Sequence, residues 1–233
     1  MKVVGDAEHH NRNHKGPWGP AHGVMIHHTV TDADRHDTVD ICRRGYASLP
    51  GPLCHGVITK DGTVHVVGYG RTNHAGGGDD EVLRAVIAES YGARPPADNE
   101  SGTDGNRHFY GFECENLGDG KDPWPAAQVE AMERAAAAVC RAHGWGGRSV
   151  IGHAEWQPGK VDPLGVDMPD LRERVGDRLK NKPGGRPATY TVRKGDTLSR
   201  IARTHDTTVA KLARLNRLVD PDRITVGQQL KLK

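Results

Sequence analysis

The sequence predicts an α/β domain, in which helices cover a sheet, followed by a small β-α-α-β module. Over about the first 180 residues, β-branched apolar runs alternate with segments of helical periodicity. The basic segment KNKPGGRPA at 180–188 then interrupts this pattern, because its two Pro and two Gly sustain neither a helix nor a strand interior. We therefore expect a first domain at 1–180, a linker at 181–188 and a second domain at 189–233.

The elements expected in the larger domain are, in order, a strand at 24–30, a helix at 34–46, a hairpin at 57–67, a helix at 81–91, an irregular segment at 94–107, a strand at 108–116 and a helix from Pro125 to Gly144. The first strand, VMIHHTV, is rich in β-branched residues. The hairpin turns at Lys60-Asp61-Gly62. Pro125 suits the first turn of the long helix, and Gly144 suits its end. One apolar face of that helix is formed by Val129, Met132, Ala136 and Val139.

The sequence of the second domain predicts two helices between two short strands. Tyr190 and Val192 alternate as in a strand, and a closing strand runs over 228–233 through Leu230 and Leu232. The apolar faces of the two helices are expected to be Leu198, Ile201 and Ala202 in the first, and Val209, Leu212 and Leu215 in the second, which spans 208–218. At about 45 residues the module is near the lower size limit for a single core without disulfides.

Composition favours a soluble globular protein rather than a membrane protein. Of the 233 residues, 35% are hydrophobic and 27% are charged, and no apolar run approaches the roughly 18 residues of a membrane span. The N-terminal sequence MKVVGDAEHHNRNHKGPWG contains no apolar stretch of signal-peptide length, so we expect synthesis in the cytosol without a signal peptide.

Charge divides the chain into an acidic part and a basic part. Residues 1–170 carry 16 basic and 24 acidic side chains, a net charge of −8, whereas residues 171–233 carry 16 and 6, a net charge of +10. A basic tail suits a polyanion such as nucleic acid or a bacterial wall, and charge alone does not choose between them. Aromatic side chains for stacking on bases are nearly absent from the tail, which argues against nucleic acid.

The cysteines and histidines raise the question of metal binding. The four cysteines, Cys42, Cys54, Cys114 and Cys140, lack the close pairing of a zinc ribbon or a CxxC motif, so free thiols are expected. Among the 14 histidines, three segments hold candidate ligands: IHHT at 26–29, His74 in TNHAGGG, and GHAEWQPGKVDP at 152–163. A catalytic zinc takes three protein ligands, and two His with one carboxylate is an attested set, which His27, His153 and Asp162 would supply.

Four motifs in this order resemble a known enzyme family. IHHT, NHAG, YGFECE and GHxEWxPGKxDP together resemble the zinc-dependent N-acetylmuramoyl-L-alanine amidases, a family that also includes the peptidoglycan-recognition proteins. The resemblance covers about residues 20–178 and implies a central mixed β-sheet flanked by helices. The C-terminal segments YTVRKGDTLSRIA, LARLN and ITVGQQLKLK resemble a LysM module. The combination resembles a phage endolysin.

The amidase resemblance assigns roles to particular residues. It implies Zn²⁺ as the cofactor, held by His27 rather than His28, by His153 and by Asp162, while His28 is expected to be structural. Lys160 matches a family lysine that stabilises the oxyanion of the tetrahedral intermediate. Other relatives use a Tyr before a His as general base, where this chain has Cys54-His55.

Proton transfer therefore falls to a carboxylate on the strand at 108–116. Glu113 matches a catalytic Glu of the family and is the favoured general base. Glu115 lies on the same strand face by the period of two and is the alternative.

Substrate contacts are assigned in both domains. His74 and Trp156 are expected near the substrate cleft, although a local structural role for His74 remains open. In the LysM module the glycan groove is expected at Gly195, Asp196, Thr197, Leu198, Asn216 and Ile224. The same residues suit a helix cap at Asp196 and core packing at Leu198 and Ile224.

The resemblance implies a peptidoglycan hydrolase that cleaves the amide between N-acetylmuramic acid and the L-alanine of the stem peptide. The alternatives are a non-catalytic peptidoglycan-recognition protein and a zinc endopeptidase acting on the stem peptide. We expect a monomer whose partner is bacterial peptidoglycan, glycan strands and stem peptides alike, with no nucleic-acid partner and no membrane insertion. An endolysin of this kind would stay in the host cytoplasm until a holin released it to the wall.

Overall fold

The structure is a computed structural model that describes residues 1–5, 13, 15–180, 189–205, 207–218 and 220–232. The chain divides into two compact units, Met1–Leu179 and Lys180–Lys233. The expected linker at 181–188 lies outside the described residues. Among the described residues, no helix is both long enough and apolar enough to span a membrane.

The larger unit is built on a mixed six-stranded sheet, which confirms the expected fold class. The strand order is β1-β4-β3-β7-β2-β8, and only β3 and β4 pair antiparallel. The strands are β1 Lys2–Val4, β2 Gly23–His28, β3 Gly56–Ile58, β4 Thr63–Val66, β7 Phe109–Cys114 and β8 Val150–Gly152. A separate two-stranded ladder joins β5 Gly77–Gly78 to β6 Thr103–Asp104.

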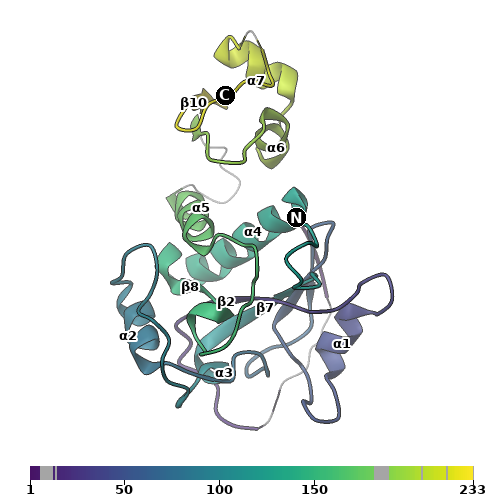
Figure 1. Ribbon diagram of the computed structural model, residues 1–233, viewed down its shortest axis with the longest axis vertical. Helices are drawn as coiled ribbons and strands as arrows, with labels where there is room; N and C mark the ends of the chain where they lie inside the picture. The colour runs from purple at the N-terminus through teal and green to yellow at the C-terminus, as the bar shows by residue number, and fades with distance from the viewer. Residues whose placement is uncertain (6–12, 14, 181–188, 206, 219, 233) are drawn as a thin grey trace. The chain divides into compact units, whose positions relative to one another are not determined.

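Helices cover both faces of this sheet (Figure 1). They are α1 Thr38–Arg44, α2 Asp80–Ala88, α3 Gly105–His108, α4 Ala126–His143 and α5 Met168–Lys180, with short 3-10 turns η1 Gly147–Ser149 and η2 His153–Glu155. Alternation along β2 explains why both faces of the sheet carry apolar side chains for helices to cover, since successive side chains of a strand point to opposite sides. Val24 and Ile26 pack with α4 and α5, whereas Met25 packs with α2.

The expected and observed elements differ mainly at their ends. The helix expected at 34–46 is shorter, because the Asp37 side chain accepts a hydrogen bond from Asp40 N and begins α1 at Thr38. The segment expected to be irregular contains β6 and α3 at its end. Strand β1 was not expected, since three residues at the N-terminus give no readable alternation. Helix α4 ends at Gly144, whose φ of 73° is the left-handed conformation that glycine adopts readily.

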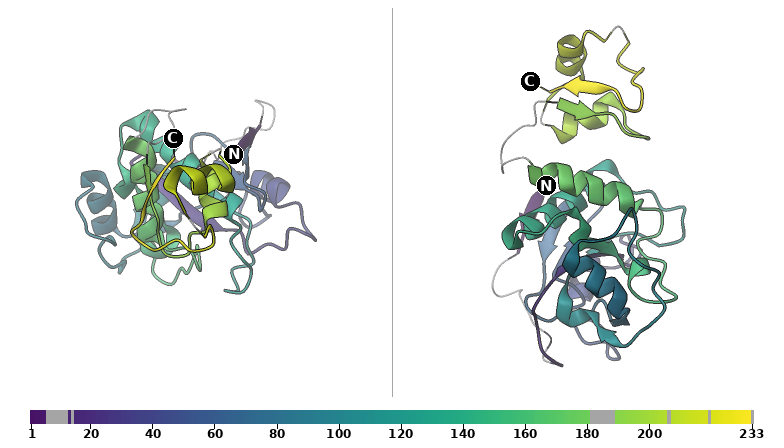
Figure 2. Two further views of the ribbon diagram at one scale, coloured as in Figure 1. Left: turned by 90° about the horizontal axis from the view of Figure 1, so that it is seen from above. Right: turned by 90° about the vertical axis from the view of Figure 1, so that its left-hand side faces the viewer.

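The smaller unit has the expected β-α-α-β order. It comprises β9 Thr189–Thr191, α6 Leu198–Thr204, α7 Val209–Asn216 and β10 Gln229–Lys231, and the two strands pair antiparallel (Figure 2). Its core is formed by Val192, Leu198, Ile201, Ala202, Leu212, Leu230 and Leu232. The cap of α6 is Thr197, which accepts from Arg200 N at 3.2 Å, so the expected cap at Asp196 is wrong.

Candidate active site

Three potential metal ligands meet at one edge of the sheet. His27 lies near the end of β2, and His153 follows the end of β8, which pairs parallel with β2. Because the carboxyl ends of parallel strands lie at the same edge, these two side chains come together there. Asp162 joins them from the segment before α5, and its backbone carbonyl accepts a hydrogen bond from Ala154 N at 2.8 Å.

The three ligand atoms are packed against one another. His27 Nδ1 lies 3.0 Å from Asp162 Oδ2 and 3.1 Å from His153 Nδ1, and His153 Nδ1 lies 3.1 Å from Asp162 Oδ2. Ligands about 2.0 to 2.2 Å from one tetrahedral zinc are about 3.3 to 3.6 Å apart, so the cluster needs only a small expansion to hold that ion. All three residues are buried.

The donor set also suits a metal chemically. His153 Nε2 lies 3.1 Å from the Gln157 Oε1 atom, which can only accept, so Nε2 carries the ring proton and Nδ1 presents a lone pair to the cluster. Burial lowers the pKa of His27 to about 4, which keeps its imidazole neutral at neutral pH. Burial alone would raise the pKa of Asp162, but its close contacts with the His153 and His27 rings hold it below its ordinary value. A neutral imidazole and an ionised carboxylate are the forms that bind metal.

Glu113 stands beside this cluster. In the sheet it pairs with His27 on one side and Val57 on the other, so the three side chains share one row and one face. Its Oε2 atom is buried and has no hydrogen-bond partner among the described residues. Burial raises the pKa of Glu113 well above its ordinary value, and the nearby Cys42 and Asp162 add to the shift while Lys160 opposes it. A buried, unpartnered carboxyl group with a raised pKa is well suited to exchange a proton.

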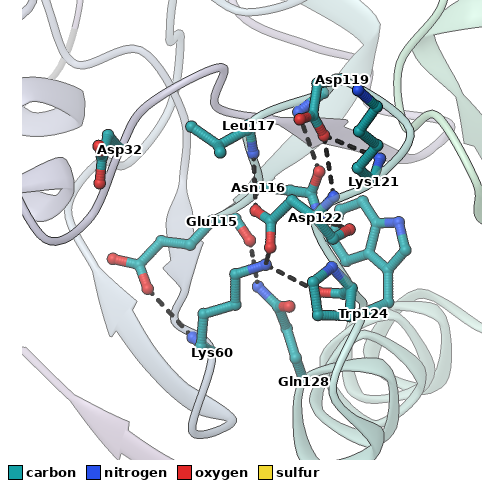
Figure 3. A network of polar contacts seen from close by, with 12 residues as sticks. Asp32, Lys60, Glu115, Asn116, Leu117, Asp119, Lys121, Asp122, Trp124 and Gln128 are labelled. Atoms are coloured by element: carbon teal, nitrogen blue, oxygen red, sulfur yellow. Dashed lines mark hydrogen bonds and ion pairs between the residues drawn. The ribbon is translucent and has the colours of Figure 1, made fainter.

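Glu115 serves a different part of the molecule. It lies just beyond the end of β7, and its Oε2 accepts a hydrogen bond from Lys60 N at 3.0 Å (Figure 3). Its backbone carbonyl accepts from Gln128 Nε2 at 2.9 Å, and the Lys60 ammonium lies 2.7 Å from Asp122 Oδ1. Glu115 therefore joins the hairpin turn to α4, and Glu113 is the better candidate for proton transfer.

Lys160 is exposed on the segment between η2 and Asp162. Its backbone N–H donates to Gln157 O at 3.1 Å, which closes a turn in that segment. Its positive charge lowers the pKa values of both His27 and Glu113, so the charge acts on both sides of the ligand cluster. An ammonium group in this position is able to stabilise negative charge that develops on a substrate.

The expectation that Trp156 contacts substrate is corrected by the structure. Trp156 is fully buried, its Nε1 donates to Ala75 O at 3.1 Å, and its ring packs edge-on against Phe109 at 5.0 Å. It is a core residue. Two glycines make room for its ring, because a Cβ on Gly78 or Gly105 would lie 2.2 or 2.6 Å from it.

His74 and His28 are also buried. His74 Nδ1 lies 2.9 Å from His27 Nε2, so His74 sits behind the ligand rather than on a surface groove, and it is only 9% exposed. His28 points to the opposite side of β2 and its Nδ1 accepts from Leu164 N at 3.2 Å, in keeping with a structural role.

Sequence reasoning missed three residues that support the cluster. Gln157 orients His153, as described above. Asn106 Oδ1 accepts hydrogen bonds from the backbone N–H groups of His74 and Ala75 at 2.7 and 2.8 Å. Gly111, in the middle of β7, leaves space for the His74 ring, and a glycine inside a strand is the signal that could have indicated this close approach.

The LysM candidates separate into core and surface residues. Leu198 is 3% exposed within the module's core, so its expected glycan contact is corrected to packing, while Ile224 packs partly buried against the same core. The Asn216 amide binds backbone atoms of Leu212 and Lys231. Asp196 Oδ2 accepts from the Tyr190 hydroxyl at 2.7 Å and from Arg193 N at 2.8 Å.

Gly195 and Thr197, on either side of Asp196, are exposed at the start of α6. Together with Asp196 and the partly buried Ile224, they are the residues left for a glycan groove.

Comparison with known proteins gives two family matches. Residues 17–165 match the model of the N-acetylmuramoyl-L-alanine amidase family Amidase_2, and residues 190–233 match the LysM domain. The chain is 30% identical to the N-acetylmuramoyl-L-alanine amidase XlyB of Bacillus subtilis over 139 residues, which cover 55% of this chain and 43% of XlyB. It is 34% identical to XlyA of the same organism over 128 residues, or 54% of this chain and 39% of XlyA. The chain thus spans less than half the length of these curated relatives.

Solved structures of amidases are similar at low sequence identity. A selenomethionine derivative of AmpD aligns with a TM-score of 0.48 at 16% identity, covering 75% of this chain and 93% of AmpD. The catalytic domain of XlyA aligns with a TM-score of 0.46 at 15% identity, covering 76% of this chain and all of that domain.

The family match itself covers more than half of the chain, and it includes all three candidate ligands as well as Glu113 and Lys160. The protein therefore belongs to the N-acetylmuramoyl-L-alanine amidase family and carries a LysM domain at residues 190–233.

Proposed function

We propose that the protein is a zinc-dependent N-acetylmuramoyl-L-alanine amidase, which hydrolyses the amide between the lactyl group of N-acetylmuramic acid and the L-alanine of the stem peptide. The observation that carries the proposal is the buried cluster of His27, His153 and Asp162 inside the family match. A zinc ion held there would polarise the scissile carbonyl and lower the pKa of a bound water toward neutrality.

Glu113 and Lys160 supply the remaining chemistry. Glu113 accepts the proton of the attacking water and passes it to the leaving amine, a role supported by its position in the row of His27 and by its unpartnered Oε2. Lys160 stabilises the oxyanion that develops on the carbonyl oxygen, a role supported by the effect of its charge on the cluster. Both interactions strengthen as charge moves in the transition state, which is what accelerates the reaction.

The second unit is proposed to hold the enzyme on its insoluble substrate. The LysM match and the net charge of +9 over residues 180–233 support binding to glycan strands of an anionic wall, with Gly195, Asp196, Thr197 and Ile224 as the groove. Tethering raises the local concentration of the catalytic unit along the polymer. We further propose that the protein serves as a phage endolysin, released to the wall by a holin, because wall hydrolysis and wall binding are joined in one chain. We also propose that it acts as a monomer.

A soluble muramoyl peptide, N-acetylmuramoyl-L-Ala-D-isoglutaminyl-L-Lys, tests the reaction without the wall. The proposal predicts free N-acetylmuramic acid and the intact tripeptide as products in mass spectrometry. The Asp162→Ala protein, which lacks one ligand, is the matched control and should show no turnover. Cleavage inside the tripeptide would indicate an endopeptidase instead. Binding of wall fragments without any cleavage would indicate a recognition protein.

A further inference from the structure

A line of buried hydrogen bonds leads from the backbone of β7 to the ligand cluster. Phe109 O lies 2.9 Å from His74 Nε2, and His74 Nδ1 lies 2.9 Å from His27 Nε2. His27 Nδ1, at the other side of its ring, faces Asp162 Oδ2 at 3.0 Å. Both rings are buried, with exposed fractions of 9% for His74 and 1% for His27. Water therefore does not replace either of these contacts.

The chemistry of the groups fixes where the ring protons lie. A backbone carbonyl can only accept, so His74 Nε2 carries a proton and donates it to Phe109 O. Among the described residues, the buried His74 ring has Phe109 O and His27 Nε2 as its hydrogen-bond partners and no carboxylate. A buried ring without an anionic partner is neutral, so its Nδ1 is an acceptor. His27 Nε2 must then be the donor in the contact between the two rings. In a neutral His27 this leaves Nδ1 unprotonated, with its lone pair directed at the ligand cluster.

The fold holds the His74 ring in this position from two sides. Asn106 Oδ1 binds the backbone N–H groups of His74 and Ala75, which fixes the loop that carries the ring. A Cβ on Gly111 would lie 2.5 Å from the ring's Cγ and Nδ1 atoms, so the ring occupies space that only glycine leaves open on β7.

We infer that His74 is a positioning residue for the zinc ligand His27, which it holds in the Nε2-protonated tautomer so that Nδ1 is free to bind the metal. This assigns His74 a role behind the ligand in place of the substrate contact expected from the sequence. The inference rests on the proposed function for the identity of the metal. Partners of this kind typically change metal affinity by about 10- to 100-fold when they are removed.

Two variants separate the acceptor role from simple packing. His74→Phe keeps a buried ring of similar size but has no acceptor for His27 Nε2. His74→Asn keeps an oxygen on Cγ, where the histidine has Nδ1, and so retains the acceptor. His55→Phe is the matched control, because His55 is also buried and lies 5.9 Å from His74 between ring centroids. Its hydrogen bonds join Gly70 O, Gly111 N and the Thr72 hydroxyl, and none joins His27.

The first measurement is the zinc dissociation constant of each folded full-length protein, by competition with a chromophoric chelator. We expect about a 10- to 100-fold weaker constant for His74→Phe, and values within about threefold of the wild type for His74→Asn and His55→Phe. Unchanged zinc affinity in a folded His74→Phe protein would overturn the inference, and so would equal losses in His74→Phe and His74→Asn.

The second measurement reads the tautomer of His27 in the metal-free protein, by nitrogen-15 NMR of the imidazole rings near pH 8. The inference requires a proton on His27 Nε2 in the wild type and in His74→Asn, and a change of tautomer in His74→Phe. A wild-type proton on Nδ1 would contradict it. This measurement needs neither turnover nor metal, so failure of the proposed amidase activity and failure of the inference give different results.

Discussion

At the scale of single residues, the carboxyl group of Glu113 combines three properties that proton transfer needs. It lies in the sheet row of His27, its Oε2 is buried without a partner among the described residues, and burial raises its pKa. Glu115, only two residues away, is instead bonded to Lys60 N. The two carboxylates therefore provide a matched pair for testing which of them takes part in the reaction.

We predict that Glu113→Gln lowers kcat by about 10²- to 10⁴-fold, because an amide cannot take the proton of the attacking water. Glu115→Gln should keep kcat within about fivefold and lower stability instead, since an amide is a weaker acceptor for Lys60 N than a carboxylate. The measurement is turnover of the muramoyl peptide by both variants, alongside their urea midpoints. A large loss of kcat in Glu115→Gln with little loss in Glu113→Gln would reverse the assignment.

The cluster of candidate ligands could be predicted from the sequence, whereas the residues that support it could not. His27, His153 and Asp162 occur in motifs that resemble a family, and the structure brings all three together. The position of His74 behind His27 depends on a glycine in β7 and on an amide from α3, which lie 37 and 32 residues after His74 in the sequence. The burial of Trp156 depends likewise on two glycines. Nothing local to either residue indicates these contacts.

At the scale of elements, a buried ion pair fastens η2, which begins with the ligand His153, to α5. Arg172 Nη1 lies 2.7 Å from Glu155 Oε2, and the two side chains are only 6% and 9% exposed. Arg172 also donates to the carbonyl groups of Ala93 and Val150. Glu155 Oε2 accepts from Gly152 N, just before the ligand. The pair thus fixes the turn that presents His153.

Arg172→Met should lower the free energy of unfolding by about 3 to 5 kcal/mol, because it leaves the Glu155 carboxylate buried and unpaired. The matched control is Arg35→Met, which breaks the exposed pair with Asp32 and should cost less than about 1 kcal/mol. Urea denaturation of both variants provides the comparison. A cost for Arg172→Met as small as that of the control would mean that the buried pair does not hold the turn.

A second set of hydrogen bonds, all to the Asp79 carboxylate, joins α2 to the irregular segment after it. Asp79 Oδ1 accepts from the backbone N–H groups of Glu81 and Val82 at the start of α2, and Oδ2 accepts from those of Asn99 and Glu100. These hydrogen bonds, led by the one from Asn99, hold the pKa of Asp79 below its ordinary value of 3.8. One carboxylate therefore caps a helix and anchors a loop.

We predict that Asp79→Asn lowers the free energy of unfolding by about 2 kcal/mol at pH 7, because the amide turns an NH₂ group toward backbone donors. The folded wild type binds fewer protons than the unfolded chain between the depressed pKa and 3.8. The contribution of Asp79 is therefore complete above pH 3.8 and is lost as the pH falls through the folded value. Thermal unfolding from pH 7 to pH 2.5 should show the difference between variant and wild type shrinking below pH 3.8, and a constant difference would contradict this account.

The order and type of the elements could be predicted because each has its own local signal. The β-branched run of β2, the turn Lys60-Asp61-Gly62 and the end of α4 at Gly144 all act within a few residues. The start of α1 at Asp37 depends on a single side-chain hydrogen bond, and β1 exists only because it pairs with β4. Such elements depend on partners that local patterns do not encode.

At the scale of the whole molecule, an acidic catalytic part is joined to a basic module. The net charge is −7 over residues 1–179 and +9 over residues 180–233, the two compact units of the chain. On the proposed anionic wall, a basic module would concentrate the enzyme, whereas the acidic part would be repelled. The small module has its own buried core, so its contribution to wall binding is separable from catalysis.

A protein ending at residue 180 should hydrolyse the soluble muramoyl peptide within about twofold of the full chain, because all candidate catalytic residues are retained. On intact walls at low enzyme concentration its rate should fall by at least about 10-fold, since the tether is lost. Added salt should reduce the difference between the two proteins on walls, because it screens the attraction of the basic module. Equal rates on walls at every salt concentration would exclude the tethering role.

The most direct test of zinc-dependent amidase activity is digestion of purified peptidoglycan with and without a metal chelator and with zinc added back. New L-alanine amino termini, other new amino termini and new reducing sugars are scored separately. We predict new L-alanine termini that disappear with the chelator and return with zinc, without new reducing ends. Termini other than L-alanine, or L-alanine release that persists in the zinc-free protein, would contradict it.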